Sequence, residues 1–279
     1  MTAPPIALIE QPVVIPGDPA CGVVLLCDHA SNHIPEEYGS LGLPPAELER
    51  HIAYDIGIAG VTRRMAEILG CPAVLSHFSR LLIDPNRGED DPTLVMRLSD
   101  GAVVPGNARA DRAEVERRLA RFYRPYDNAV GRVIEEALAS GNPPAVVSMH
   151  SFTPAWKGVP RPWHVTVLWD ADPRLALPLI EALAADKALL VGDNEPYDGA
   201  LAGDTVNRHA TARGLANALL EVRQDLIGGE EGQAEWAERI AAALLPILAE
   251  PETHRVAMHP TRTASRHRAA FAPEPSPSI

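Results

Sequence analysis

The chain alternates short apolar runs with longer amphipathic stretches, and this alternation constrains its fold more than any other feature of the sequence. Each apolar run ends abruptly in polar residues, which is typical of buried strands that deliver side chains to one edge of a sheet. The runs that we interpret as strands cover residues 22–27, 73–76, 81–83, 145–149, 164–169, 188–191 and 218–220.

Helix signals fill the stretches between these runs. Asp111 and Asp172 are candidate N-caps, because an aspartate side chain can accept hydrogen bonds from the first backbone N–H groups of a helix. Strands that alternate with helices predict an α/β domain in which helices cover both faces of a mostly parallel sheet. The expected helices cover residues 44–47 with 56–69, 111–140, 172–185 and 230–249.

We expect one folded domain followed by a short extension. The chain has 279 residues, and single α/β domains of about 250 residues are common. Neither a linker nor an internal repeat interrupts residues 1–250, which we interpret as the catalytic domain. Residues 251–279 are rich in proline and arginine and poor in large apolar residues, so they cannot form a core of their own. We expect this extension to lie over the body or over a neighbouring subunit, which leaves a homo-oligomer open.

The charge of the chain limits its partners. A net charge of −12 argues against nucleic acids and anionic membrane surfaces, which attract positively charged proteins. Of the 25 basic residues only Lys157 and Lys187 are lysines, so nearly every positive charge is a planar guanidinium suited to a carboxylate. An acidic protein with this composition could still bind a small anion.

Cysteine usage and hydropathy indicate the compartment. The three cysteines are too few and too unevenly spaced for a disulfide framework, which favours a reducing environment. No apolar run approaches the roughly 20 residues of a membrane helix. We therefore expect a soluble cytoplasmic protein.

Two histidines directly follow predicted strands. His29 comes after the run 22–27 and His150 after the run 145–149. Ligands bind at the carboxyl ends of strands in α/β sheets, so both histidines are candidate functional residues. Together with Asp55 they could supply the three-ligand open site of a catalytic zinc. The alternatives are a polar loop that caps a turn, for the segment around His29, and a helix N-cap for Asp55.

Charged residues near two other runs are candidates for substrate binding and acid–base catalysis. Arg80, Asn86 and Arg87 could donate bidentate hydrogen bonds to a substrate carboxylate. A salt bridge between Asp84 and an arginine is the structural alternative. Glu221 could act as the general base toward a metal-bound water, or it could be a surface charge on an edge strand.

Five motifs occur in order across about residues 20–250. They are Asp28-His29-Ala30-Ser31 with Ile34-Pro35, Tyr54-Asp55-Ile56-Gly57, Ser79-Arg80-Leu81-Leu82-Ile83-Asp84-Pro85-Asn86-Arg87, Met149-His150-Ser151-Phe152 and Asn194-Glu195-Pro196-Tyr197. In these motifs the chain resembles the N-formylglutamate amidohydrolases, or N-formylglutamate deformylases. The resemblance implies a single three-layer α/β/α domain with a central mixed, mostly parallel sheet, similar to the zinc carboxypeptidase and phosphorylase/hydrolase-like fold.

The resemblance also implies the metal ligands. His29, Asp55 and His150 match the positions expected to hold one Zn²⁺ ion, and another divalent metal remains an alternative. Carboxypeptidases take their second ligand from a glutamate three residues after the first histidine, where this chain has Asn32. The choice between Asp55 and Asn32 as the third ligand therefore stays open.

Substrate and acid–base roles follow from the same resemblance. Asn86 and Arg87 are similar to the pair that binds the substrate α-carboxylate in carboxypeptidase-like enzymes. Residues 220–223 are similar to the segment whose glutamate is the catalytic base, which implies Glu221, with Glu195 as a second candidate. Further candidates for substrate contact are Arg80, Arg223, Ser31 and His209.

The implied activity is metal-dependent hydrolysis of an N-formyl amino acid, above all of N-formyl-L-glutamate to formate and L-glutamate, a reaction of histidine degradation. One alternative keeps the chemistry but changes the substrate to another N-acyl amino acid, a small peptide or a cell-wall fragment. Another is a non-catalytic protein that binds an acidic metabolite. In addition, we expect residues 91–107, rich in Gly, Pro and Asp, to shape the pocket.

Overall fold

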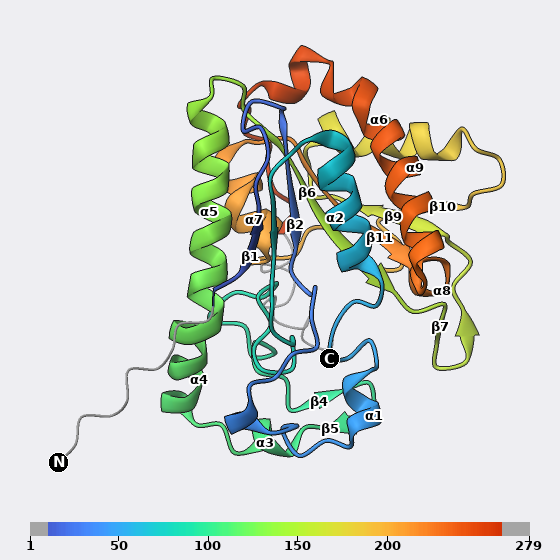
Figure 1. The fold of residues 1–279 in the computed structure, drawn as a ribbon. Helices are drawn as coiled ribbons and strands as arrows, with labels where there is room; N and C mark the ends of the chain where they lie inside the picture. The colour runs from blue at the N-terminus through green and yellow to red at the C-terminus, as the bar shows by residue number, and fades with distance from the viewer. Residues whose placement is uncertain (1–10, 264–279) are drawn as a thin grey trace, which may run out of the picture.

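A mixed seven-stranded sheet runs through the centre of the protein (Figure 1). The computed structural model describes residues 11–263. In spatial order the strands are β1 (Val13–Ile15), β3 (Ala73–Leu75), β2 (Val23–Cys27), β6 (Ala145–Phe152), β11 (Asn217–Arg223), β9 (Val165–Leu168) and β10 (Val191–Asp193). Strands β3, β2, β6 and β11 are parallel to one another, whereas β1 and β9 run antiparallel to their neighbours β3 and β11.

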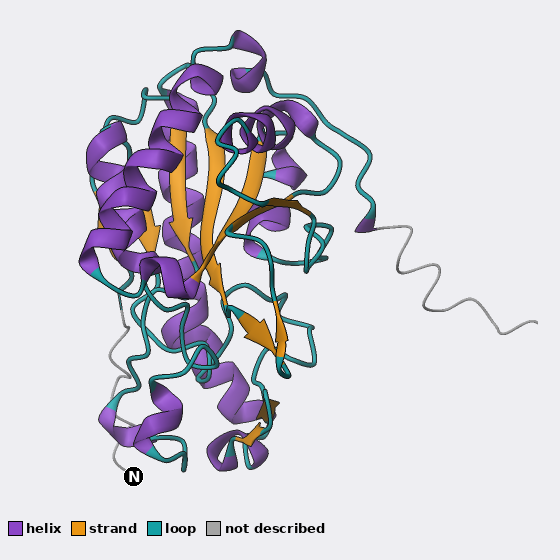
Figure 2. Cartoon of the chain, turned by 90° about the vertical axis from the view of Figure 1, so that its right-hand side faces the viewer, coloured by secondary structure: helices purple, strands orange, loops and turns teal. Residues whose placement is uncertain are grey.

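Helices cover both faces of this sheet (Figures 1 and 2). Side chains alternate along a strand, so Leu25 and Val147 belong to one hydrophobic core and Val24 and Val146 to the other. The expected α/β/α layers and the mixed, mostly parallel sheet are confirmed. The helices on the Leu25 side are α2 (Ile58–Leu69), α6 (Pro173–Ala184) and α9 (Glu230–Leu248), and those on the Val24 side are α5 (Arg124–Ala139) and α7 (Thr205–His209).

Both predicted N-caps are confirmed. The Asp111 carboxylate accepts a hydrogen bond of 2.8 Å from the backbone N–H of Glu114 at the start of α4 (Arg112–Arg118). The Asp172 carboxylate accepts one of 3.1 Å from the N–H of Arg174 at the start of α6. Helix α4 continues through a π-helical turn, η2 (Leu119–Tyr123), into α5, so the predicted long helix is present.

One predicted strand is wrong, and a second predicted strand and one predicted helix are wrong in part. Residues 81–83 form a turn, although all three are fully buried, because their apolar side chains fill the core on the Val24 side and burial alone does not determine backbone conformation. Within 188–191 only Val191 lies in β10, which extends to Asp193. Residues 44–69 form two helices, α1 (Pro45–Leu48) and α2, separated by turns. The other short elements are η1 (Glu36–Tyr38), β4 (Leu98–Ser99), β5 (Ala102–Val103), α3 (Pro105–Ala108), β7 (Ala155–Trp156), β8 (Val159–Pro160), η3 (Thr211–Arg213), α8 (Gln224–Ile227) and η4 (Pro251–His254).

The part of the extension that the structure describes packs on the body of the chain. The backbone N–H of Ala257 donates a hydrogen bond of 2.8 Å to the carbonyl of Gly214. Arg262 forms ion pairs with Asp170 and Asp198. Residues 264–279 of the predicted extension lie outside the described residues. Within residues 11–263 there is no helix with the length and apolar character that crossing a bilayer requires.

Candidate metal centre and active site

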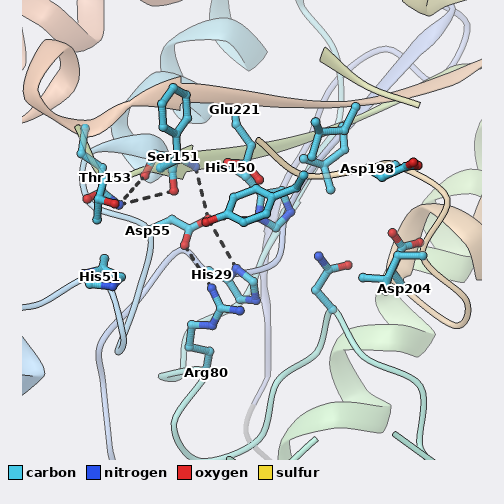
Figure 3. Close-up of a pocket in the computed structure, with 18 of the residues that line it drawn as sticks. His29, His51, Asp55, Arg80, His150, Ser151, Thr153, Asp198, Asp204 and Glu221 are labelled. Carbon is cyan, nitrogen blue, oxygen red and sulfur yellow. Dashed lines mark hydrogen bonds and ion pairs between the residues drawn. The ribbon is translucent and has the colours of Figure 1, made fainter. Parts of the chain in front are cut away.

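The candidate site lies where the carboxyl-terminal parts of parallel strands meet. His29 follows the end of β2, His150 lies near the end of β6, and Glu221 pairs with His150 in the register of β11 and β6. Asp55 comes from the turn that precedes α2. These four residues, far apart in sequence, line one cavity of about 420 Å³ (Figure 3). The structure thus places the two histidines side by side, with ring centroids 4.9 Å apart.

Asp55 lies between the two histidines. Its Oδ2 atom is 2.9 Å from Nδ1 of His150 and 3.4 Å from Nδ1 of His29. Two ligand atoms bound tetrahedrally to one zinc ion at about 2.0–2.1 Å lie roughly 3.3 Å from each other. The three buried side chains also offer donor atoms that all lie within 4.8 Å of one another. This donor set therefore fits a single metal ion.

A carboxylate lies within hydrogen-bond distance of Nε2 in each of the two imidazole rings. Nε2 of His29 lies 2.7 Å from Oδ1 of Asp84, and Nε2 of His150 lies 3.1 Å from Oδ2 of Asp28. A histidine that donates a hydrogen bond from one ring nitrogen to a carboxylate presents the other nitrogen as a more basic ligand. Both rings are thus oriented with Nδ1 toward Asp55.

Asp28 connects the site to the helices on its side of the sheet. Its side chain is fully buried and accepts hydrogen bonds from the hydroxyl groups of Ser148, Tyr126 and Thr205, at 2.9, 2.9 and 2.7 Å. Tyr126 lies on α5 and Thr205 begins α7. A buried carboxylate needs such partners, since an unsatisfied one is costly. These bonds fix the position of the oxygen that faces His150.

Negative charge is concentrated around the two histidines. Burial lowers the pKa of His150, but hydrogen bonds with Asp28 and Asp55 outweigh burial and raise this pKa to about 10. Burial works to raise the pKa of both carboxyls, yet the charges and hydrogen bonds of the histidines hold the pKa of Asp28 and of Asp55 well below the usual range. Such a cluster favours a bound cation, whose binding would release the proton of His150.

Glu221 has the properties of a general base. Its side chain lines the cavity and is 8% exposed. Burial raises the pKa of its carboxyl to about 7, and the positive charges of His150 and Arg161 offset burial only in part. A carboxyl that titrates near neutral pH can both accept and return a proton. In Figure 3 its side chain lies beside His150.

Asn86 and Arg87 line the same cavity. Oδ1 of Asn86 accepts a hydrogen bond of 3.1 Å from the backbone N–H of Thr205, which fixes this side chain against the start of α7. The Arg87 guanidinium donates to the hydroxyl of Thr93 and to the carbonyl of Asn86, at 3.3 and 2.9 Å. Both acceptors are neutral, and a guanidinium has five N–H donors. Arg87 therefore retains donors for an anionic ligand.

Arg80 also lines the cavity but already has anionic partners. Its guanidinium lies 2.8 Å from Oδ2 of Asp84 and 3.4 Å from Oδ1 of Asp55. The structural alternative considered for Asp84, a salt bridge with an arginine, is therefore present. Arg80 holds both carboxylates that face His29, which makes its observed role one of positioning.

Three residues singled out in the sequence lie away from the cavity. Glu195 is exposed, and the hydroxyl of Ser31 accepts a hydrogen bond from the backbone N–H of His33. The side-chain amide of Asn32 donates to the carbonyl of Leu48 at 3.0 Å. Asp55, and not Asn32, thus lies in the donor group with the two histidines.

Two further candidates, Arg223 and His209, form structural contacts instead. Arg223 pairs with Asp225 at 2.8 Å, and it also donates to the carbonyls of residues 161–163. Nε2 of His209 lies 2.6 Å from Asp127. Neither candidate lines the cavity. Both side chains are bound by partners outside the cavity. Each therefore stabilises the structure around the cavity and does not reach the candidate metal centre.

The cavity contains residues for which the sequence predicted no role. Arg161 and Tyr197 line it, as does Asp204, whose carboxylate caps the start of α7 and whose pKa is raised to about 7 by burial. Arg161 precedes β9, which runs antiparallel to β11 and therefore begins at the edge where β11 ends. A parallel β9 would have placed Arg161 at the opposite edge, so only the strand direction could have revealed it.

The expectation that residues 91–107 shape the pocket is wrong. Within the described chain, this segment contributes no side chain to the cavity wall. It carries the β4–β5 hairpin, and Asn107 secures its end by donating to the carbonyls of Leu81 and Met96 at 2.7 Å. The segment lies against residues 81–83, and the hydroxyl of its Thr93 accepts a hydrogen bond from Arg87, so it supports the cavity wall from behind.

The α/β fold and the buried His–Asp group are those of an enzyme with a candidate metal centre, and the comparisons give its family. The sequence model of the N-formylglutamate amidohydrolase family matches residues 21–228. A gene product of Agrobacterium tumefaciens, known from a crystal structure, is 35% identical in sequence, with a TM-score of 0.81 over 87% of this chain and 96% of that one. The protein belongs to the N-formylglutamate amidohydrolase family, a family of hydrolases.

A second solved structure shares the fold at lower identity. It is the N-formylglutamate amidohydrolase from Ralstonia eutropha JMP134, which is 21% identical, with a TM-score of 0.63 over 87% of this chain and 95% of that one. Among curated proteins no match to the chain is found.

Proposed function

We propose that the protein is a zinc-dependent hydrolase that converts N-formyl-L-glutamate and water into formate and L-glutamate. The observation that carries this proposal is the convergence of His29, Asp55 and His150 on one point, with Glu221 paired to His150 on the next strand. Membership of the family supports the choice of substrate.

In this proposal His29, Asp55 and His150 hold the metal ion. When bound, zinc supplies Lewis acidity, which lowers the pKa of a water molecule and polarises a carbonyl oxygen. Glu221 accepts a proton from the attacking water at its carboxylate and returns it to the amine nitrogen as the C–N bond breaks. The products are formate and the free amino acid, so the atoms of water are fully accounted for.

Asn86 and Arg87 bind the α-carboxylate of the substrate. Arg87 has neutral acceptors for some of its N–H groups and retains others, and the backbone of α7 holds Asn86 in place. Binding of the α-carboxylate at this place orients the formyl group relative to Glu221 and the metal ligands. Such orientation accounts for a large part of the rate enhancement in hydrolytic enzymes. Arg80 contributes by fixing Asp55 and Asp84.

A metal analysis followed by a substrate panel tests the proposal. The purified protein should contain about one zinc per chain and release formate from N-formyl-L-glutamate, with less activity on N-acetyl amino acids, small peptides and cell-wall fragments. Faster turnover of any of those would replace the substrate assignment but retain the metal chemistry. Tight binding of acidic metabolites without turnover of any compound would show that the protein is a binder and not an enzyme.

A further inference from the structure

Arg161 lies in an aromatic enclosure on the wall of the cavity. Its side chain is 8% exposed, and the centre of its guanidinium lies 5.8, 5.5 and 5.1 Å from the ring centroids of Phe152, Trp156 and Tyr197. Rings at these distances attract a cation through their π faces. They also restrict the rotation of the side chain, so the guanidinium is presented to the cavity in a defined position.

Arg161 forms no ion pair within the described part of the chain. Its guanidinium donates to the hydroxyl of Thr153 at 3.1 Å, to the carbonyl of Thr153 at 3.5 Å and to the hydroxyl of Tyr197 at 2.7 Å. All three acceptors are neutral, and at least two of its five N–H groups have no partner among them. Cationic side chains are rarely buried without an anionic partner. An anionic ligand group in the cavity would provide that partner.

Two of the three arginines that line the cavity form no ion pair within residues 11–263. Arg80 is paired with Asp55 and Asp84, whereas Arg87 and Arg161 donate to neutral acceptors alone. Arg87 comes from the segment after β3, and Arg161 from the segment before β9. In the sheet, β3 and β9 lie on opposite sides of β6, the strand that carries His150. The cavity thus offers two separate guanidinium positions around one reaction centre.

The backbone of the Arg161 segment is held firmly. Nη1 of Arg223, at the end of β11, donates to the carbonyls of Arg161 and Trp163 at 3.3 and 3.2 Å. The backbone N–H of Arg161 donates to the carbonyl of Pro154 at 2.8 Å. These contacts keep the segment in place relative to Glu221 on the same strand as Arg223.

We propose that Arg161 binds the side-chain carboxylate of the substrate, while Arg87 binds the α-carboxylate, so that the site selects N-acyl amino acids with an acidic side chain. This inference rests on the proposed function. Arg161 is in that case a specificity-determining residue, and a dicarboxylate supplies one anionic group to each guanidinium. A substrate of the same shape without the second charge leaves the buried charge of Arg161 without an anionic partner, which costs binding energy.

The test compares N-formyl-L-glutamate with N-formyl-L-glutamine, which has nearly the same shape but a neutral side chain. Formate release by the zinc-loaded wild-type enzyme should favour the glutamate compound by about 10- to 100-fold in kcat/KM. Arg161→Gln should remove most of this preference by lowering kcat/KM for the glutamate compound. The value for the glutamine compound should fall much less, by the part that comes from losing the positive charge near Glu221, and Arg161→Lys should restore part of the preference. Arg87→Gln should weaken both compounds equally.

Binding measurements separate this inference from the proposed function. Calorimetric titration of the zinc-loaded Glu221→Gln protein with the two compounds should show the same preference, and Arg161→Gln in that background should abolish it. A wild-type protein that releases no formate but binds with an Arg161-dependent preference would overturn the proposed function and leave the inference intact. The inference would be overturned if Arg161→Gln lowered kcat/KM equally for both compounds with an unchanged melting temperature. It would also be overturned if the Glu221→Gln protein that retains Arg161 bound both compounds with equal affinity.

Discussion

Glu221 and His150 occupy paired positions on the adjacent parallel strands β11 and β6. These are the two longest strands of the sheet, with 7 and 8 residues, and backbone hydrogen bonds fix the separation of the two side chains. The candidate base and a candidate metal ligand therefore keep their relative position without help from a loop.

Replacement of Glu221 by glutamine should abolish proton transfer and leave the metal centre intact. We expect kcat for formate release to fall by about 10²- to 10⁴-fold, with zinc content unchanged as measured by elemental analysis. Glu195→Gln is the matched control, because Glu195 is exposed and lies away from the cavity. If Glu195→Gln loses as much activity as Glu221→Gln, the base has been assigned to the wrong residue.

Removal of either imidazole should remove the metal. His29→Ala and His150→Ala should each lower zinc content from about one per chain to near zero after dialysis against a weak chelator. His33→Ala serves as the control, since His33 is exposed on the loop after β2. Full retention of zinc by either of the first two variants would show that the metal binds elsewhere.

Loss of the carboxylate behind His29 should weaken the metal centre without destroying it. Asp84 faces Nε2 of His29 at 2.7 Å and also pairs with Arg80. Asp84→Asn should therefore reduce zinc affinity by about 10- to 100-fold, as measured by competition with a chromophoric chelator. An affinity equal to that of the wild type would mean that the ring of His29 is oriented by other contacts.

The buried carboxyl of Asp204 should make stability depend on pH. Burial raises its pKa from 3.8 to about 7 in the folded state, so the folded protein binds more protons than the unfolded chain, and stability falls as pH rises toward about 7. Asp204→Asn retains an N-cap but removes this titration. From pH 5.5 to pH 8 the variant should gain about 2 kcal/mol in free energy of unfolding relative to the wild type. Urea denaturation with EDTA present measures this difference, and parallel pH profiles would contradict it.

The sharp turn after Asp55 should tolerate no side chain. Gly57 has a φ of +82°, and a Cβ atom there would lie 2.1 Å from the carbonyl oxygen of Ile227. Gly57→Ala should lower the free energy of unfolding by about 2–4 kcal/mol and displace Asp55 enough to weaken zinc binding. Gly70→Ala, at the other end of α2, has a similar φ of +62° but open space around it, and should cost only about 1 kcal/mol. Equal melting temperatures for the two variants would rule out the steric argument.

Residues at strand ends were predictable, and residues placed by other contacts were not. His29 and His150 follow apolar runs, and the parallel neighbours β2 and β6 bring their ends to one edge. Arg223 is at a strand end too, but its guanidinium binds backbone carbonyls and Asp225. A sequence indicates the position of a residue along a strand, but not which of several nearby acceptors its side chain will contact.

The direction of the strands was the second feature that could not be predicted from the sequence. Arg161 reaches the cavity because β9 is antiparallel to β11, and apolar runs of similar composition occur in strands of either direction. The turn at 81–83 shows the converse, since a fully buried apolar run can be irregular when neighbouring side chains enclose it. Both features depend on the whole assembled sheet, which local patterns do not contain.

The position of β11 in the sheet affects how the enzyme is made. This strand comes late in the chain, at residues 217–223, yet it lies between β6 and β9, which are synthesised earlier. A nascent chain that has not reached Asn217 leaves β6 and β9 without the neighbour they share, and it also lacks Glu221. The step that closes the sheet is thus the step that places Glu221 beside His150.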